Sequence, residues 1–430
     1  MNIPAYEEDF AGFINRADDR GELVVQPRMG FGAWALMREG LQRTAEADAT
    51  TVGTVTLDSY TRVGDFAGAR AALAEGAPLN GYPLLAHGAE ATRALLDEVA
   101  GPAFPVQVRH GSPRPQEIFA ELLAAGLHAT EGGPVSYCLP YSRTPLRESV
   151  RDWAEGCELL AASDALGAQP HLESFGGCML GQMCPPSLLV ALSVLEGLFF
   201  AQHGLRSMSL SYAQQTSQDQ DVEALAALHR LATEELGPGV RRHIVLYAYM
   251  GLYPVTPEGA DRLLASAAEL AVRGGAARLI VKTAAEAQRI PTIGENVAAL
   301  ELAARSAAGA GHGAGEGIRP PGTGDGIYTE ARSIVHAVRE LHPDLGTALV
   351  RAFDKGLLDV PFCLHPDNPR RTRSRIDEHG RLCWADTAGL PFTAAPGGGE
   401  QPRLTAAGLM DSLTYVSRTY DGNAGGGCAA

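Results

Sequence analysis

The chain has 430 residues, a formal net charge of −15 and 45% apolar residues, an ordinary apolar share for a globular protein. This length accommodates one α/β barrel of about 250 residues together with extensions. The acidic balance argues against nucleic acid and against anionic membrane surfaces as partners. An anionic ligand would therefore need a local group of cations that acts against the charge of the whole protein.

The cysteines and the first residues indicate the cellular compartment. Seven cysteines without regular spacing argue against a disulfide framework. Cys178 and Cys184 lack a neighbouring pair with zinc-like spacing, so we interpret them as buried thiols and expect no metal site. The acidic N-terminus has no apolar core typical of a signal peptide, and the most apolar run, 185–202, contains Glu196 and is short for a membrane span. We expect a reduced, cytoplasmic protein without membrane contact.

Short apolar runs rich in β-forming residues alternate with helical stretches through the first 300 residues. One such stretch, 260–273, places Leu263, Leu264, Ala267 and Leu270 on one helical face. The alternation predicts parallel strands with helices outside them, and eight runs predict a (β/α)₈ TIM barrel. The expected strand runs are residues 22–28, 51–60, 81–88, 104–111, 171–177, 207–213, 243–251 and 278–283.

The composition changes after Ala303. Residues 305–326 are rich in glycine, proline and alanine and are typical of a linker or mobile loop. We therefore divide the chain into a barrel (1–303), a mobile loop or linker (304–326) and a C-terminal extension (327–430). The glycine-rich end, GNAGGGCAA, predicts a disordered tail.

Charged residues stand at the C-terminal ends of several expected strands. In a barrel these ends meet on one face, and the active site lies there. Each residue alone is also compatible with an ordinary solvated or ion-paired side chain, but their recurrence favours a site. The residues are Arg28 after the first run, Asp58 and Arg62 after the second, Arg109 and His110 after the fourth, and Glu173 and Lys282 after two others.

The stretch HATEGGPVSYCLPYSR, residues 128–143, combines one acid with glycines, prolines and two tyrosines. Glycine and proline disfavour a helix, so the stretch predicts a loop whose backbone can approach a ligand closely. Its acid is Glu131, and its tyrosines are Tyr137 and Tyr141. The alternative for the tyrosines is core packing with satisfied hydroxyl groups.

These residues suggest a class of ligand. Guanidinium groups of Arg28, Arg62 and Arg109 can bind carboxylates through two hydrogen bonds each. Glu131 can meet an ammonium group, and tyrosine hydroxyls add donors. The complementary ligand carries more than one carboxylate and one ammonium, as an acidic amino acid does. The pattern leaves the reaction open, because a carboxylate with a nearby tyrosine serves a lyase as well as a mutase.

Six segments of the sequence resemble the epsilon (large) subunit of the coenzyme B12-dependent glutamate mutase family, also called methylaspartate mutase. They keep their order and nearly their separations, and the resemblance covers most of residues 20–370. It implies a (β/α)₈ barrel that interconverts L-glutamate and threo-3-methyl-L-aspartate. The segments are RMGFG, TLDSYTR, LNGYP, RHGSP, TEGGPVSYCLPY and VKTAAEAQRIPT.

The resemblance also implies roles for individual residues. Arg28, Arg62 and Arg109 match the arginines that grip both substrate carboxylates. Glu131, Tyr137 and Tyr141 match further substrate-binding residues, with His110 beside the third arginine, and Glu131 would accept a hydrogen bond or a proton from the substrate ammonium as a catalytic residue. Positions that touch adenosylcobalamin match Gly30, Asn80, Pro140, Tyr253, Lys282, Glu286 and Ile290, although the family often has phenylalanine at Tyr253.

Two of the implied cofactor residues make chemical sense by their spacing. Lys282 and Glu286 are four residues apart, so an ammonium and a carboxylate could bond the two hydroxyls of a ribose if this junction is helical. The alternative is an ion pair along a helix. For Asn80, within LNG, the alternative is a turn residue.

The family implies a partner. Its cobalt-ligating D-x-H-x-x-G motif lies on a small sigma subunit, in an assembly of two large and two small subunits. Here Asp377-Glu378-His379 begins such a pattern, but Leu382 stands where glycine is required, and we attribute the near-match to chance. In the mechanism that the resemblance implies, the Co–C bond of adenosylcobalamin breaks homolytically, hydrogen leaves C4 of glutamate, and a glycinyl fragment migrates.

Three alternative functions stay open. The first is a mutase for a related acidic amino acid, and the second is a non-catalytic barrel subunit that binds acidic amino acids. The third is a cobalamin-independent lyase. Retention of both the arginine trio and the Lys282–Glu286 pair favours glutamate mutase over each of them.

Overall fold

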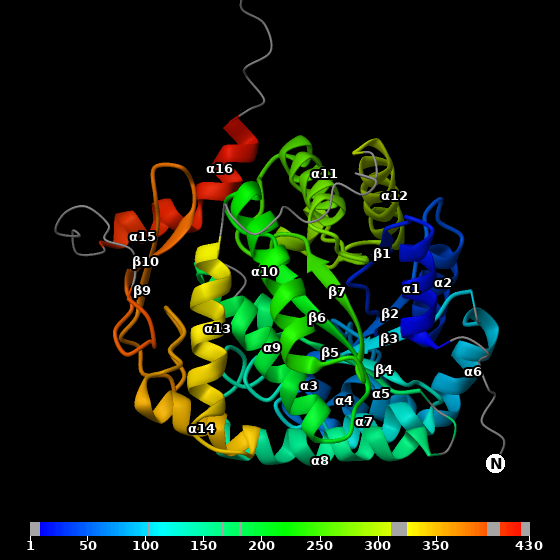
Figure 1. Cartoon of the computed structure of the whole chain (residues 1–430). Coiled ribbons are helices and arrows are strands. Elements are labelled where there is room, and N and C mark those ends of the chain that lie inside the picture. Colours follow the sequence, from blue (N-terminus) through cyan, green and yellow to red (C-terminus); the bar gives the residue numbers. More distant parts are fainter. Residues whose placement is uncertain are drawn as a thin grey trace, which may run out of the picture.

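Eight parallel strands form one closed barrel in the computed structural model (Figure 1), which describes residues 9–101, 103–165, 167, 169–179, 183–310, 325–393 and 405–422. The strand order is β1-β8-β7-β6-β5-β4-β3-β2, and a parallel bridge between Val25 and Thr51 joins the first strand to the start of the second. The predicted (β/α)₈ fold is confirmed. The strands are β1 (Val24–Gln26), β2 (Gly53–Thr56), β3 (Val106–Arg109), β4 (Ala129–Gly132), β5 (His171–Ser174), β6 (Ser207–Ala213), β7 (Arg241–Tyr247) and β8 (Arg278–Ile280).

Helices cover the outside of the barrel. The predicted apolar face of 260–273 is confirmed, because Leu263, Leu264, Ala267 and Leu270 are buried. This helix begins where the sequence provides a cap: the Thr256 side chain accepts the N–H of Gly259 at 3.1 Å, and Pro257 follows. The helices are α1 (Phe10–Asp19), α2 (Trp34–Ala45), α3 (Ser59–Val63), α4 (Phe66–Ala74), α5 (Leu84–His87), α6 (Ala89–Val99), α7 (Gln116–Ala124), α8 (Leu146–Asp164), α9 (Pro186–Gln202), α10 (Gln218–Leu236), α11 (Pro257–Arg273) and α12 (Ile293–Gly309).

One expected strand was wrong, and the strand that replaces it lies in the expected loop. Residues 81–88 contain the helical turn α5 after Pro83, and only Tyr82 forms an isolated bridge, to Leu57. The fourth strand is β4, within HATEGG. All four of its residues pair with β5, and Ala129 and Thr130 also pair with β3 on the other side. Hydrogen bonds to two neighbours make a strand of this short polar stretch, although it lacks an apolar run.

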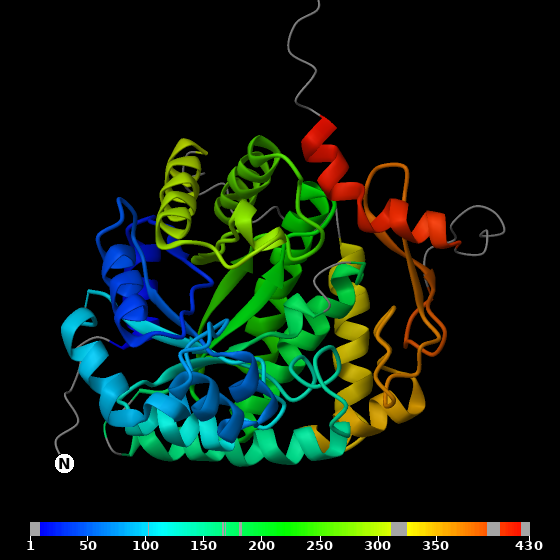
Figure 2. The same cartoon turned by 180° about the vertical axis from the view of Figure 1, so that it is seen from behind.

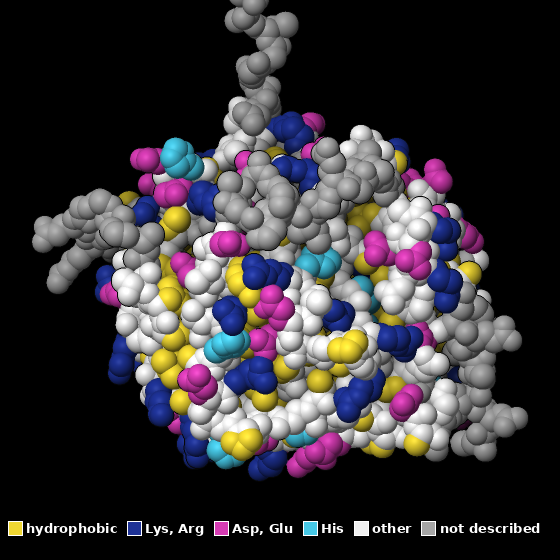
Figure 3. Space-filling model, viewed as in Figure 1, with side chains coloured by type: hydrophobic (Ala, Val, Ile, Leu, Met, Phe, Trp, Pro, Cys, Tyr) yellow, Lys and Arg dark blue, Asp and Glu magenta, His cyan; other side chains and the backbone are white. Residues whose placement is uncertain are grey.

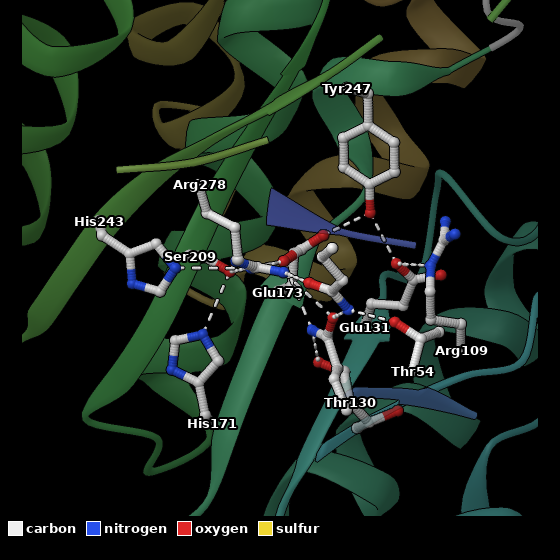
Figure 4. A network of polar contacts seen from close by, with 12 residues as sticks. Thr54, Arg109, Thr130, Glu131, His171, Glu173, Ser209, His243, Tyr247 and Arg278 are labelled. Carbon is white, nitrogen blue, oxygen red and sulfur yellow. Dashed lines mark hydrogen bonds and ion pairs between the residues drawn. The ribbon is translucent and has the colours of Figure 1, made fainter. Parts of the chain in front are cut away.

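The barrel interior is polar at its centre (Figure 4). Arg278 of β8 and Glu173 of β5 form an ion pair, and both side chains are fully buried. Arg278 also donates to Gln107 Oε1 at 3.2 Å and to Ser209 Oγ at 3.1 Å. Gln26 Nε2 donates to the same Gln107 oxygen at 2.8 Å. Most barrel interiors are filled with branched apolar side chains. In this barrel, an ion pair and hydrogen bonds join the strands across the centre instead.

The boundary after the barrel lies later than predicted. Helix α12 continues to Gly309 and packs on α11 and α2, so residues 304–309 belong to the last barrel helix and not to a linker. Residues 311–324 of the expected linker lie outside the described residues, as do 423–430 of the expected tail. Helix α13 of the extension already includes Asp325, two residues before the predicted start of the extension.

The C-terminal extension lies along one side of the barrel, as both ribbon views show (Figures 1 and 2). Its first helix packs on α9 and α10, and its last helix packs on α11. Residues Asp377–His379, the near-match to a cobalt motif, form the turn of a hairpin in which the Asp377 carboxylate accepts the N–H of His379 at 2.9 Å. The elements are α13 (Asp325–Arg339), α14 (Leu345–Lys355), β9 (Arg373–Ile376), β10 (Leu382–Asp386), α15 (Ala406–Leu413) and α16 (Tyr415–Gly422).

The surface carries both signs of charge. Acidic and basic side chains are interspersed on the face shown in Figure 3. Within the described part of the chain, every helix is too short or too polar to cross a lipid bilayer.

The buried ion pair at the barrel centre is expected to matter for stability. Arg278→Met should lower the free energy of unfolding by about 3–5 kcal/mol, because Glu173 would remain buried without its cation. The matched control is Arg241→Met on the neighbouring strand, where a side chain 47% exposed pairs with Asp9. That loss should stay below about 1 kcal/mol. Urea unfolding followed by circular dichroism measures both values, and equal losses would contradict the assigned role.

Candidate functional site

The C-terminal ends of the barrel strands surround a cavity of about 630 Å³. Its walls come from the segments that follow β1, β2, β3, β4, β5 and β8. Pro140 and Tyr253 are the two predicted site residues that do not line it. The predicted residues that line it are Arg28, Gly30, Arg62, Asn80, Arg109, His110, Glu131, Tyr137, Tyr141, Lys282, Glu286 and Ile290.

Glu131 lines this cavity and is 1% exposed. Figure 4 shows its carboxylate between Arg109 and Tyr247. Its Oε2 accepts hydrogen bonds from Arg109 Nε at 2.8 Å and from the Tyr247 hydroxyl at 2.6 Å. Its Oε1 accepts a hydrogen bond from the Tyr137 hydroxyl. Glu131 is therefore not a solvated loop acid. A carboxylate has about four acceptor positions, so one position is left for a ligand.

Arg109 ends β3 beside this carboxylate. Burial by itself would lower the pKa of its guanidinium, but Glu131, Tyr247 and Tyr137 raise that pKa well above its ordinary value. Arg109 thus stays cationic although it is only 5% exposed. Among the described residues only Glu131 bonds it, through Nε, and both Nη groups keep their capacity to bind a carboxylate.

Two further arginines approach from neighbouring segments. Arg62 lies on α3, whose N-terminus is capped by Asp58, and its side chain lies against Gly111, where an added Cβ would come 3.0 Å from Arg62 Nε. Arg28 donates from Nη1 to Glu286 Oε2 at 2.9 Å. The Nε groups of both arginines are buried and bond to none of the described residues. Three cations with unused donors in one cavity suit a ligand that carries carboxylates.

His110 is a neutral donor in the wall. Its Nδ1 accepts the N–H of Ser112 at 3.1 Å, which leaves the proton on Nε2. Burial lowers the pKa of His110 to about 3, and Arg62 adds to this effect. The ring stacks on Trp153 with 5.7 Å between the ring centroids, and a hydrogen bond to the Glu131 backbone opposes the lowering of the His110 pKa.

The two tyrosines of the glycine-rich stretch differ. Tyr137 is 3% exposed and shows the core packing that was the alternative for it, because its ring packs on His110 and Phe175 while its hydroxyl bonds Glu131. Burial, together with the negative charge of Glu131, raises the pKa of Tyr137 well above its ordinary value. Tyr141 is 44% exposed at the cavity wall, 6.1 Å from the Tyr137 ring.

The Lys282–Glu286 pair stands at the junction after β8. The junction is the 3₁₀ helix η2 (Ala284–Ala287), and the described contacts give no ion pair between these two residues. Lys282 Nζ instead donates to the Gly251 carbonyl at 3.2 Å and lies over the Tyr253 ring at 4.4 Å. Burial lowers the pKa of Lys282 to about 8, although Glu286 opposes this shift. Buried Tyr253 therefore supports Lys282 from outside the cavity.

Two of the remaining predicted cofactor residues, Gly30 and Asn80, also have structural roles. A Cβ on Gly30 would lie 2.2 Å from the Thr56 carbonyl oxygen, so backbone packing requires glycine there. Asn80 accepts the N–H of Ser59 at 3.0 Å and thereby holds the start of α3, which agrees with the turn interpretation. Ile290 is 49% exposed at the rim.

Sequence reasoning missed several residues of the site. Tyr247 ends β7 and joins Glu131 to Glu173, and the same rule of polar residues at strand ends would have found it. Phe175 follows β5 and carries no chemical signal in the sequence. The other unpredicted residues of the wall are Met29, Phe31, Thr56, Gly111, Gln288, Arg289, Pro291 and Asn296.

Comparisons of this chain with a family model and with known proteins agree on one family. A family model described as methylaspartate mutase E chain matches residues 3–411. The glutamate mutase epsilon subunit of Halobacterium salinarum is 32% identical over 375 residues, which cover 84% of this chain and 76% of that protein. The epsilon subunit of Desulfitobacterium hafniense is 31% identical over 413 residues, 91% of this chain and 82% of that protein. The epsilon subunit of Escherichia coli O157:H7 is 30% identical over 410 residues, with the same two coverages.

The neutral state of His110 predicts a dependence of stability on pH. Its pKa in the folded protein lies far below the ordinary 6.5, so between these values only the unfolded chain binds the proton. Stability is then present above pH 6.5 and is lost as the pH falls. Between pH 6 and pH 5 the wild type should lose about 1 kcal/mol more than His110→Asn, in which the amide oxygen replaces Nδ1. Urea unfolding at both values measures the difference, and parallel losses would refute the assignment.

Proposed function

We propose that this chain, which belongs to the methylaspartate mutase E chain family, is the large substrate-binding subunit of a glutamate mutase. The reaction is the interconversion of L-glutamate and threo-3-methyl-L-aspartate, which makes the enzyme an isomerase. The observation that carries the proposal is the single cavity in which buried Glu131 faces Arg28, Arg62 and Arg109. This arrangement complements two carboxylates and one ammonium.

The arginines bind the two carboxylates of the substrate. Arg109 offers its two Nη groups while Nε stays on Glu131, so its guanidinium plane is set before the substrate arrives. The guanidinium of Arg62, which lines the same cavity, supports a second contact. Hydrogen bonds between charged partners contribute about 1.5–3 kcal/mol each, and they orient the substrate as well as hold it.

Glu131 receives the ammonium of the substrate. Three of its acceptor positions are taken by Arg109, Tyr137 and Tyr247, and the ammonium takes the fourth. The hydroxyls of Tyr137 and Tyr247 hold the Glu131 carboxylate in place for the ammonium. Aromatic side chains of Phe31, Tyr137 and Phe175 line the cavity beside these charged groups.

The cavity also fits the adenosyl part of adenosylcobalamin. Lys282 has three donors and uses one on Gly251, and Glu286 accepts from Arg28 and from the N–H of Thr283 with capacity left over. Both residues can therefore hold ribose hydroxyls. When bound, this cofactor supplies the organic radical that removes hydrogen from the substrate.

A small sigma-type subunit supplies the cobalt ligand in this proposal. In the chain itself, the described residues contain no group of three metal-ligating side chains, and the near-match at Asp377–His379 is a hairpin turn. The complete enzyme is then a heterotetramer of two large and two small subunits in the cytoplasm.

An activity assay tests the function directly. The purified chain with adenosylcobalamin alone should not convert glutamate, and addition of a sigma-type subunit should produce 3-methylaspartate, detected by proton NMR. Turnover without the small subunit would contradict the division of labour. Absence of turnover by the assembled complex, with adenosylcobalamin bound, would contradict the reaction.

Substitution of one arginine tests the carboxylate site. Arg109→Lys keeps the charge but loses the planar donor pair, and kcat/KM for glutamate should fall roughly 10- to 150-fold, which corresponds to about 1.5–3 kcal/mol. The control is Arg206→Lys, at the opposite end of the barrel before β6, where the guanidinium bonds backbone carbonyls. Equal kinetics in wild type and Arg109→Lys would place Arg109 outside the substrate site.

A further inference from the structure

One buried acid outside the cavity has no role in the reaction described above. Glu196 lies in the middle of α9, and its side chain is fully buried in a helix that is otherwise almost entirely apolar. A carboxylate in such surroundings is costly unless hydrogen bonds satisfy it. No lysine or arginine of the described chain forms an ion pair with it, so its partners must be neutral donors.

Four donors surround the carboxylate. Oε1 accepts the backbone N–H groups of Val135 at 3.2 Å and Ser136 at 2.9 Å. Oε2 accepts the hydroxyls of Ser136 at 2.9 Å and Ser174 at 3.0 Å. Burial raises the pKa of Glu196 to about 7, and the bonds from Ser136, Ser174 and Val135 oppose this rise.

These donors belong to segments that form the cavity wall. Val135 and Ser136 begin the turn that carries Tyr137 and Tyr141, and the Tyr137 hydroxyl reaches Glu131. Ser174 ends β5 directly before Phe175, and its Oγ also accepts the N–H of Gly176 at 3.2 Å. One carboxylate thus joins two neighbouring stretches of the cavity wall from behind.

The chain makes room for this contact. Gly133 lies against the carboxylate, and an added Cβ would come 2.1 Å from Glu196 Cδ. Glycine at this position therefore serves the approach of Glu196 and not the approach of a ligand. Ser149 Oγ of α8 holds the carbonyl side of the turn's start, because it donates to the Pro134 carbonyl at 2.8 Å. The N–H groups of Val135 and Ser136 bond Glu196, while a later backbone bond, from Tyr137 N–H to the Gly133 carbonyl at 3.1 Å, runs within the turn.

We propose that Glu196 is a positioning residue that anchors the turn 133–141 to the barrel and thereby sets the places of Tyr137 and Tyr141. Glu196 caps the turn although it belongs to helix α9, because its carboxylate accepts the N–H groups of Val135 and Ser136 at the start of the turn. The kinetic consequence rests on the proposed glutamate mutase function, while the anchoring itself does not.

Two substitutions separate the hydrogen bonds from the packing. Glu196→Met fills a similar volume and has no strong acceptor. Glu196→Gln keeps both contacts, because its amide oxygen accepts from the two N–H groups while its amide nitrogen donates to the serine hydroxyls. Leu195→Met is the matched control, since Leu195 is the adjacent, fully buried residue of the same helix.

Hydrogen exchange of the whole chain without substrate tests the anchoring. The amides of Val135 and Ser136 should exchange at least about tenfold faster in Glu196→Met, relative to core amides of β6, and within about threefold of wild type in Glu196→Gln. Leu195→Met should leave this ratio unchanged. An unchanged ratio in Glu196→Met, or an equal rise in all three variants, would overturn the proposal.

Kinetics of the assembled complex give the second readout. Glu196→Met should raise KM for glutamate and lower kcat, because Tyr137 no longer holds Glu131 in place, and Glu196→Gln should restore both. Faster exchange with unchanged kinetics would refute the link to the site. If the complex has no glutamate mutase activity at all, the exchange ratio still decides whether Glu196 anchors the turn.

Discussion

The buried ion pair between Arg278 and Glu173 is the constraint around which the barrel is arranged. Two opposite charges inside a closed barrel are tolerable only if further hydrogen bonds satisfy most of their remaining donors and acceptors. Short strands deliver such partners from Gln26, Gln107 and Ser209, although Arg278 Nε has no partner among the described residues. The hydrogen-bond network continues from the barrel centre to the cavity, because the Tyr247 hydroxyl contacts both Glu173 and Glu131 (Figure 4). The centre of the barrel and the floor of the site are therefore one hydrogen-bonded system.

This system explains how an acidic protein can present cations to an anionic ligand. Glu131 balances Arg109, and Glu286 balances Arg28, so the cavity has paired charges in the absence of a ligand. Under the proposed function, ligand carboxylates meet guanidinium groups that are already oriented. Arg28 also lies between the two halves of the cavity, since its partner Glu286 belongs to the proposed ribose site. Arg28, which the resemblance assigns to the substrate, therefore contacts Glu286, which the resemblance assigns to the cofactor.

The differences between sequence and structure have particular causes. HATEGG has no apolar alternation, yet residues 129–132 form β4, because two adjacent strands bond both of its edges. The run 81–88 has the apolar content of a strand, but it forms a helical turn after Pro83. Lys282 and Glu286 have helical spacing, but a 3₁₀ turn directs them to different partners. For β4, partners distant in sequence outweigh the local preference, whereas a local proline and a local capping box decide the other two cases.

The barrel architecture, seven of its eight strands and the gathering of charged residues at strand ends follow from the sequence alone, because periodicity and residue type are local properties. Most of the predicted site residues indeed line one cavity. Only the tertiary structure decided that Glu131 is buried among Arg109, Tyr137 and Tyr247, and that Glu196 stands behind the turn. These contacts join residues as many as 116 positions apart, from Glu131 to Tyr247. Burial and pairing over such separations arise only when the barrel closes and excludes water from its centre.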